Sequence, residues 1–208
     1  MDFLERNKNL FEEIKAKIAK EPEKQENYLL LGKLYVMGEM FDEALEVYTE
    51  LLKIDPLNIQ ALVNSGSIYF FKKEYQKAIN IYSRALETEN ADFSVYYNLG
   101  NTYAELRQFK HAIENYKKAL ALDKENSALY TAIGLLHQDM SEYPEAVANF
   151  QKALELEPEN SEYNNNIACA YVKMKMLDEA VYHFKKALVG APDDVKINLC
   201  CANAYSSL

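Results

Sequence analysis

The segment YYNLGNTYAELRQFKHAIENYKKALALD, from Tyr96 to Asp123, decides the fold of this chain. Its apolar residues recur at intervals of three and four on either side of a break near Arg107, which predicts two amphipathic helices joined by a turn. Gly100 lies inside the first of these helices, where glycine costs about 1 kcal/mol relative to alanine. A helix that retains this residue needs a compensating gain, and the remainder of the chain indicates what that gain is.

Similar residues return every 34 positions along the chain. A fixed period of this length is typical of a repeat array, in which each unit packs on its neighbours. We therefore expect Gly100 to face a small residue, Ala112, so that two antiparallel helices approach closely. The series are Gly32, Gly66, Gly100 and Gly134, continued by Ala168 and Ala202; then Ala44, Ala78, Ala112, Ala146 and Ala180; and the aromatic series Tyr48, Tyr82, Tyr116, Phe150 and Phe184.

Composition narrows the classes of function. The 208 residues carry a formal net charge of −9, which argues against a nucleic acid or an anionic membrane surface as the main partner. The start of the chain lacks the apolar run of a signal peptide, and no stretch is apolar enough for membrane insertion. Cys169, Cys200 and Cys201 lack metal-ligand spacing, and we interpret them as free thiols in a reducing compartment. These features predict a cytoplasmic protein.

The pattern Tyr96, Leu99, Gly100 and Tyr103, followed by Ala112 and Tyr116, resembles the tetratricopeptide repeat (TPR) family, W-x-x-L-G-x-x-Y…A-x-x-x-F…A…P. It occurs five times in tandem, over residues 25–58, 59–92, 93–126, 127–160 and 161–194. Departures are the lack of tryptophan, His137 in place of tyrosine and Ala168 in place of glycine. The resemblance implies an all-α, right-handed superhelical solenoid of antiparallel helix pairs, with the first helix of each pair, helix A, lining a concave groove.

The two ends depart from the pattern. Residues 1–24 contain an amphipathic helix that we interpret as an N-terminal cap, a degenerate half repeat resembling the second helix of a pair, helix B. Residues 195–208 resemble helix A of a sixth, truncated repeat, with Cys201, Ala202 and Tyr205 at pattern positions. Because an apolar face would then be left uncovered, we expect either that the chain is cut within a repeat or that something else packs there.

The resemblance also places candidate peptide-binding residues on the groove. Asn64, Asn98 and Asn166 share one repeat position, which Ala132 interrupts; amides both donate and accept, so they could pair with the backbone of an extended peptide. This row is similar to the asparagine ladder in the repeats of the sugar transferase that modifies protein serines. Two alternatives stay open, solvated asparagines and aromatics that only pack between helices. The candidates are Asn64, Phe70, Phe71, Tyr97, Asn98, Asn101 and Asn166.

Other chemistry finds little support. Family members that bind chaperone C-termini use basic groove residues, but the corresponding positions here are Val63, Ala128 and Ala132, which argues against a free acidic C-terminus as ligand. We interpret His137 as a satisfied core residue, and His111 and His183 as surface residues. No catalytic constellation, phosphate-binding loop or metal spacing occurs, so we expect no enzyme activity, no cofactor and no metal site.

The sequence thus predicts a protein-protein interaction scaffold or adaptor that binds a peptide or partner helix in the concave groove. Two alternatives stay open. One is a structural scaffold that self-assembles into a homo-oligomer through its terminal helices. The other is the targeting domain of a larger enzyme that continues beyond Leu208. The identity of the partner, the pathway, the oligomeric state and the binding face are not encoded in any motif.

Overall fold

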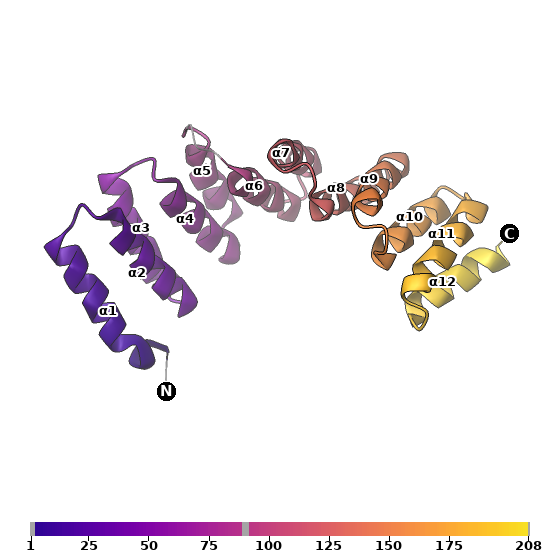
Figure 1. The fold of residues 1–208 in the computed structure, drawn as a ribbon. Coiled ribbons are helices and arrows are strands. Elements are labelled where there is room, and N and C mark those ends of the chain that lie inside the picture. Colours follow the sequence, from indigo (N-terminus) through magenta and orange to yellow (C-terminus); the bar gives the residue numbers. More distant parts are fainter. Residues whose placement is uncertain (1–2, 89–91, 208) are drawn as a thin grey trace. The chain divides into compact units, whose positions relative to one another are not determined.

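The structure, a computed structural model, describes residues 3–88 and 92–207, and in these residues it consists of twelve α-helices and no strands (Figure 1). The all-α class predicted from the sequence is confirmed. The helices are α1 (Phe3–Lys20), α2 (Gln25–Met37), α3 (Phe41–Ile54), α4 (Ile59–Phe71), α5 (Tyr75–Ala85), α6 (Phe93–Glu105), α7 (Phe109–Leu122), α8 (Ser127–Asp139), α9 (Tyr143–Leu156), α10 (Ser161–Lys173), α11 (Leu177–Gly190) and α12 (Val195–Ser206).

The chain forms two compact units, Met1–Arg107 and Gln108–Leu208. In the N-terminal unit, α2 packs on α3 and α4 packs on α5; in the C-terminal unit, α8 packs on α9 and α10 packs on α11. Two helices fall within each segment predicted as a repeat, whereas α1 and α12 are the single helices predicted at the two ends.

Each helix A after the first begins at a polar cap. Five side chains, spaced 34 residues apart, accept a backbone N–H from the first turn of the helix that follows them. Such caps satisfy amide groups that have no partner within the helix, and each contributes about 1 kcal/mol. The capping residues are Asn58, Asp92, Asn126, Asn160 and Asp194.

The turns from helix A to helix B follow the same period. A single residue in each turn has a left-handed backbone, with φ between 56° and 62°. This conformation ends a helix and lets the chain reverse; in one turn, the Glu74 N–H donates to the Tyr69 carbonyl at 2.8 Å. None of these residues is glycine, although Gly38 precedes Glu39 in the first turn. They are Glu39, Lys73, Arg107, Ser141 and Lys175.

The glycine series has a packing explanation in the structure. A Cβ atom on Gly66 would lie 2.4 Å from Cε1 of Tyr82, and one on Gly134 would lie 2.5 Å from Cε1 of Phe150. The atoms nearest to these two glycines therefore belong to the helix B aromatic ring. The ring lies directly over the helix A backbone, so any side chain at this position would displace a fully buried ring. Gly100 and Ala112 belong to different units, and their pairing stays a prediction.

Candidate functional site

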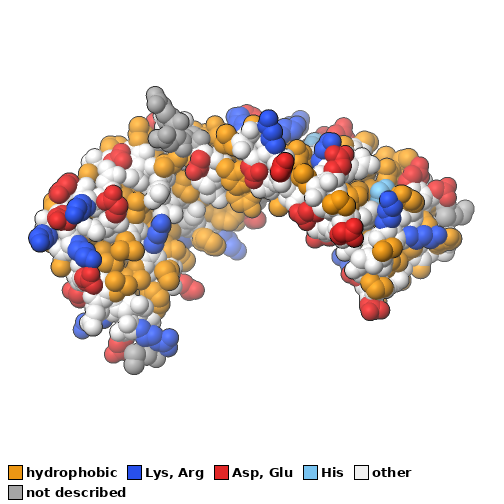
Figure 2. Space-filling view, in the orientation of Figure 1, with side chains coloured by type: hydrophobic (Ala, Val, Ile, Leu, Met, Phe, Trp, Pro, Cys, Tyr) orange, Lys and Arg blue, Asp and Glu red, His pale blue; other side chains and the backbone are white. Residues whose placement is uncertain are grey.

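The helix A elements of the N-terminal unit carry very little charge. Within α2, α4 and α6, the charged residues are Glu26, Lys33 and Glu105, and α4 has none. By contrast, the helix B element α3 carries Asp42, Glu43, Glu46, Glu50 and Lys53. Figure 2 shows hydrophobic side chains gathered over the N-terminal unit on the visible face. A surface formed by these helix A elements suits a partner that contributes mainly apolar and neutral polar groups.

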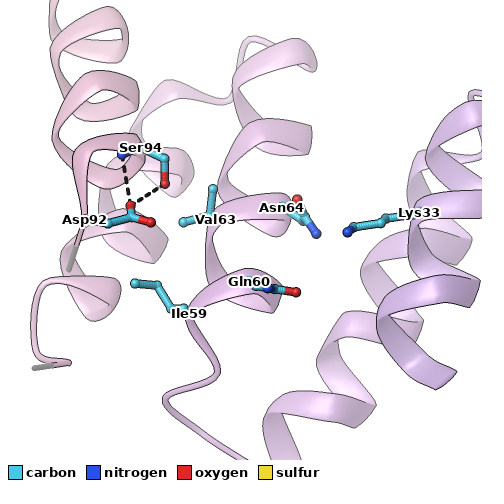
Figure 3. Close-up of a pocket in the computed structure, with 7 residues that line it drawn as sticks. All are labelled: Lys33, Ile59, Gln60, Val63, Asn64, Asp92 and Ser94. Carbon is cyan, nitrogen blue, oxygen red and sulfur yellow. Dashed lines mark hydrogen bonds between the residues drawn. The ribbon is translucent and has the colours of Figure 1, made fainter. Parts of the chain in front are cut away.

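A small open pocket of about 110 Å³ is formed by α2, α4 and the start of α6. Figure 3 shows Lys33 of α2 and Asn64 of α4 pointing toward each other, and Gln60 pointing to the same side. The other residues lie on the opposite side of α4. The lining residues are Lys33, Ile59, Gln60, Val63, Asn64, Asp92 and Ser94. Of these, the sequence identified Asn64 as a binding residue but missed Lys33. The one indication in the sequence is that Lys33 occupies the same repeat position as Asn101, which was predicted to line the groove.

Asn64 is half-buried and lies close to the hydroxyl of Tyr48. Burial raises the pKa of Tyr48 to about 12, and the Asn64 amide opposes that increase. The hydroxyl nevertheless has no hydrogen bond of good geometry among the described residues. The Asn64 side chain is therefore not committed to a strong internal hydrogen bond and can reach a ligand in the pocket.

The two adjacent phenylalanines of α4 have different environments. Phe70 packs partly against the hydrophobic core and meets Tyr75 edge-on, with the ring centroids 5.6 Å apart. Phe71 is 69% exposed and stacks on Phe41, with centroids 6.4 Å apart and an angle of 7° between the rings. Met37, which is 71% exposed, ends α2. Phe70 thus matches the packing alternative, and Phe71 is accessible to a partner.

The three candidates on α6 also belong to the N-terminal unit. Tyr97 is exposed and stacks on Phe93 at a centroid distance of 5.6 Å. Asn98 is half-buried, and its backbone carbonyl accepts a hydrogen bond from Thr102 Oγ1 at 2.6 Å. Asn101 is half-buried as well. All the predicted groove asparagines are half-buried, and whether they bind a peptide or are only solvated stays open.

Asn166 lies apart from the other candidates, in the C-terminal unit. It is half-buried, and its Nδ2 atom is buried without a hydrogen-bond partner in the described part of the chain. A pocket of this unit has a volume of about 280 Å³ and is formed by α10, α11 and α12. Asn166 does not line it. Its lining residues are Cys169, Val172, Lys173, Leu177, Phe184, Cys200, Asn203, Ala204 and Ser207.

The cysteines are free, as the sequence predicted. Burial raises the pKa of the Cys169 thiol, the nearby Cys200 adds to the increase, and Lys196 and Lys173 reduce it. A thiol with a raised pKa is a weak nucleophile at neutral pH, because the thiolate is the reactive form. Cys201 is buried in the core of the C-terminal unit.

One of the histidine interpretations is wrong. His183 is not a surface residue: its Nδ1 lies 3.0 Å from Oδ1 of the buried Asn164, and its ring stacks on Tyr171 with centroids 5.7 Å apart. Burial, and then Lys186, lower the pKa of His183. The prediction for His137 holds, because this residue is half-buried and its Nδ1 lies 2.7 Å from Glu142 Oε2. The pattern could not show that this side of α11 packs against Asn164 and Tyr171 of α10.

No set of three His, Cys, Asp or Glu side chains in residues 3–88 and 92–207 is arranged to hold a metal ion. In the same residues, no helix combines the length and the apolar character that crossing a membrane requires. The absence of a cofactor and of a metal stays a prediction.

Comparison with known families gives matches along most of the chain. Models described as tetratricopeptide repeat match residues 26–58, 93–126, 127–160 and 149–182, and a model described as TPR repeat matches residues 66–107. The matches at 93–126 and 127–160 have the same bounds as two of the predicted repeats. No curated protein matches the chain in sequence.

Solved structures share the fold. The crystal structure of YrrB, described as a TPR protein with an unusual peptide-binding site, has a TM-score of 0.77 and 21% identity, covering 93% of this chain and 97% of that one. The crystal structure of the MamA protein has a TM-score of 0.76 and 27% identity, with coverage of 84% and 96%. MamA from residue 41 to the end, from Desulfovibrio magneticus RS-1, has a TM-score of 0.73 and 20% identity, with coverage of 83% and 97%.

Proposed function

We propose, from the premise that this chain belongs to the tetratricopeptide repeat family and is a protein-interaction scaffold, that it holds a peptide or partner helix on α2, α4 and α6. The observation that carries the proposal is the combination, on nearly uncharged helices, of the Asn64 pocket and the exposed Phe71. Exposed aromatic side chains commonly contribute most of the binding energy at protein interfaces.

The similarity to YrrB adds support, because that protein is described as having a peptide-binding site. Since the identity is 21%, the likeness concerns the fold, and the binding residues proposed here rest on the N-terminal unit itself. We further propose that the chain acts without catalysis and in the cytoplasm. The uncovered surface of α12, where Val195, Leu199 and Tyr205 are exposed, favours self-assembly as the second candidate function.

The experiment is a quantitative pull-down from cytosol with three proteins, the wild type, an Asn64→Ala/Phe71→Ala variant and a Tyr182→Ala control. Tyr182 is an exposed aromatic on α11, so the control removes a comparable side chain from the other unit. Each removed anchor should cost about 1–2 kcal/mol of binding free energy, so we expect partners to be depleted about tenfold or more by the double variant and retained by the control.

Circular dichroism checks that all three proteins are folded. An unchanged partner list for the double variant would contradict the proposed groove and would favour self-assembly or another binding surface.

A further inference from the structure

The pocket formed by α2, α4 and the start of α6 contains one cation, Lys33, without an ion-pair partner among the described residues. Lys33 is the only positive charge of α2, α4 and α6, and no carboxylate of the described residues forms an ion pair with it. The pocket also contains Asp92, but that carboxylate caps α6, accepting the Ser94 N–H at 2.9 Å and the Ser94 hydroxyl at 2.5 Å. Asp92 also lies across α4 from Lys33 (Figure 3).

The neighbours of Lys33 suit an anionic group. Asn64 and Gln60 point into the space between α4 and α2 that Lys33 also enters (Figure 3). An amide can donate to a carboxylate while the ammonium group supplies the opposite charge. A carboxylate side chain of a bound segment would thus find a cation and amide donors in one place.

An apolar site lies farther along the same two helices. Met37 follows Lys33 by four residues on α2, and Phe71 follows Asn64 by seven on α4, so each pair occupies one helical face. With a rise of about 1.5 Å per residue, the offsets are about 6 Å on α2 and about 10 Å on α4. An extended peptide advances about 3.3 Å per residue, so three residues span the larger offset.

We propose that this face recognises an extended segment that carries an Asp or Glu side chain and, three residues away, an aromatic or branched aliphatic side chain. The carboxylate binds Lys33 and the Asn64 amide, and the apolar side chain packs on Phe71 and Met37. The stacked Phe41 ring restricts the movement of Phe71, so the apolar site needs little reordering when a ligand binds. This inference rests on the proposed function, of which it specifies the ligand.

The net charge of the protein and the local charge of Lys33 favour opposite kinds of ligand. With a net charge of −9, long-range attraction would favour a basic segment over an acidic one. Selection of an acid must therefore come from Lys33 itself, as a local contact that determines specificity more than affinity.

The test is selection from a display library of random peptides, fused to the carrier at their C-termini so that no free terminal carboxylate is offered. The full chain is the target, next to its Lys33→Glu variant and a Lys53→Glu control. Lys53 is exposed on α3, so the control makes the same change of net charge outside this face.

We expect the wild type and the control to enrich an acid three positions from an apolar residue. The Lys33→Glu variant should select Lys or Arg at the acidic position with the spacing kept, and should bind a wild-type-selected peptide about tenfold more weakly. Two results would overturn the acidic-ligand inference but leave the proposed function intact. One is that the selected peptides lose binding to Phe71→Ala but contain no acidic residue; the other is that they bind Lys33→Glu as tightly as the wild type. Peptides insensitive to both Asn64→Ala and Phe71→Ala, or no selected peptide at all, would overturn the proposed function as well.

Discussion

The helix B aromatic is tyrosine in both repeats of the N-terminal unit, but tyrosine or phenylalanine in the C-terminal unit. In the N-terminal unit, the helix B aromatic is tyrosine, and the hydroxyl of Tyr82 lies 3.1 Å from Ser67 Oγ. In the C-terminal unit, Tyr116 keeps the hydroxyl, whereas the equivalent rings of Phe150 and Phe184 lack it, although they are as deeply buried. The difference teaches that packing over helix A requires the shape of the ring, whereas the polar atom is free to vary from repeat to repeat.

The variation extends to the asparagine row. Asn64 lies beside the Tyr48 hydroxyl, whereas Asn166, three repeats later, has a buried Nδ2 without a partner in the described residues. Phenylalanine at position 150, three repeats after Tyr48, offers no hydroxyl to such an amide. The N-terminal unit thus combines a pocket that contains Lys33 and Asn64 with an exposed aromatic surface, whereas the pocket formed by α10, α11 and α12 is lined by cysteines, apolar side chains, Lys173, Asn203 and Ser207.

The largest expected effect tests the feature that the units share. Gly66→Leu and Gly134→Leu should each lower the free energy of unfolding by about 3 kcal/mol or more, because each adds a side chain where a buried ring lies. Urea unfolding followed by far-UV circular dichroism measures the change. Ala128→Leu, at an exposed position of α8, is the control and should stay within about 0.5 kcal/mol. If only one of the two glycine variants lost stability, the two units would not share this packing.

A smaller effect on stability should distinguish the hydroxyl of Tyr82 from that of Tyr48. The Ser67 hydroxyl donates to the Val63 carbonyl at 2.9 Å, so the Tyr82 hydroxyl donates to Ser67. Tyr82→Phe should therefore lower the free energy of unfolding by about 1 kcal/mol. Tyr48→Phe should leave it unchanged or raise it slightly, because that hydroxyl is buried without a good hydrogen bond. Equal losses in both variants, measured by urea unfolding, would contradict this distinction.

The smallest effect is a pH dependence confined to the C-terminal unit, which contains all three histidines of the chain. Burial lowers the pKa of His183 below its ordinary value of 6.5, so the unfolded chain takes up this proton first. The contribution of neutral His183 to the free energy of unfolding is therefore complete above about pH 6.5, and it is lost as the pH falls through the pKa of His183 in the folded state. The urea midpoint should fall less between about pH 7.5 and 5.5 in His183→Gln than in the wild type; identical slopes would exclude this origin.

The sequence by itself determined the period, the all-α class and the position of the helices, because each depends on spacing along one chain. Residues three and four apart share a helical face, and residues 34 apart share a place in the repeat. The single helices at the ends followed from the same reasoning. The turn near Arg107 was predicted from the break in the pattern, but its left-handed backbone was not, because residues such as Glu39 and Lys73 also occupy this position and the surrounding hydrogen bonds hold them there.

Only the tertiary structure decided which residues meet across helices. It placed an aromatic ring over Gly66, Phe70 against the core and Phe71 in solvent. It also packed His183 against α10 and brought Lys33 and Asn64 into one pocket. The physical reason is that such contacts depend on how one helix is rotated and shifted against the next. A rotation of about 100° separates adjacent residues of a helix, and a repeat pattern does not specify the angle at which neighbouring helices pack.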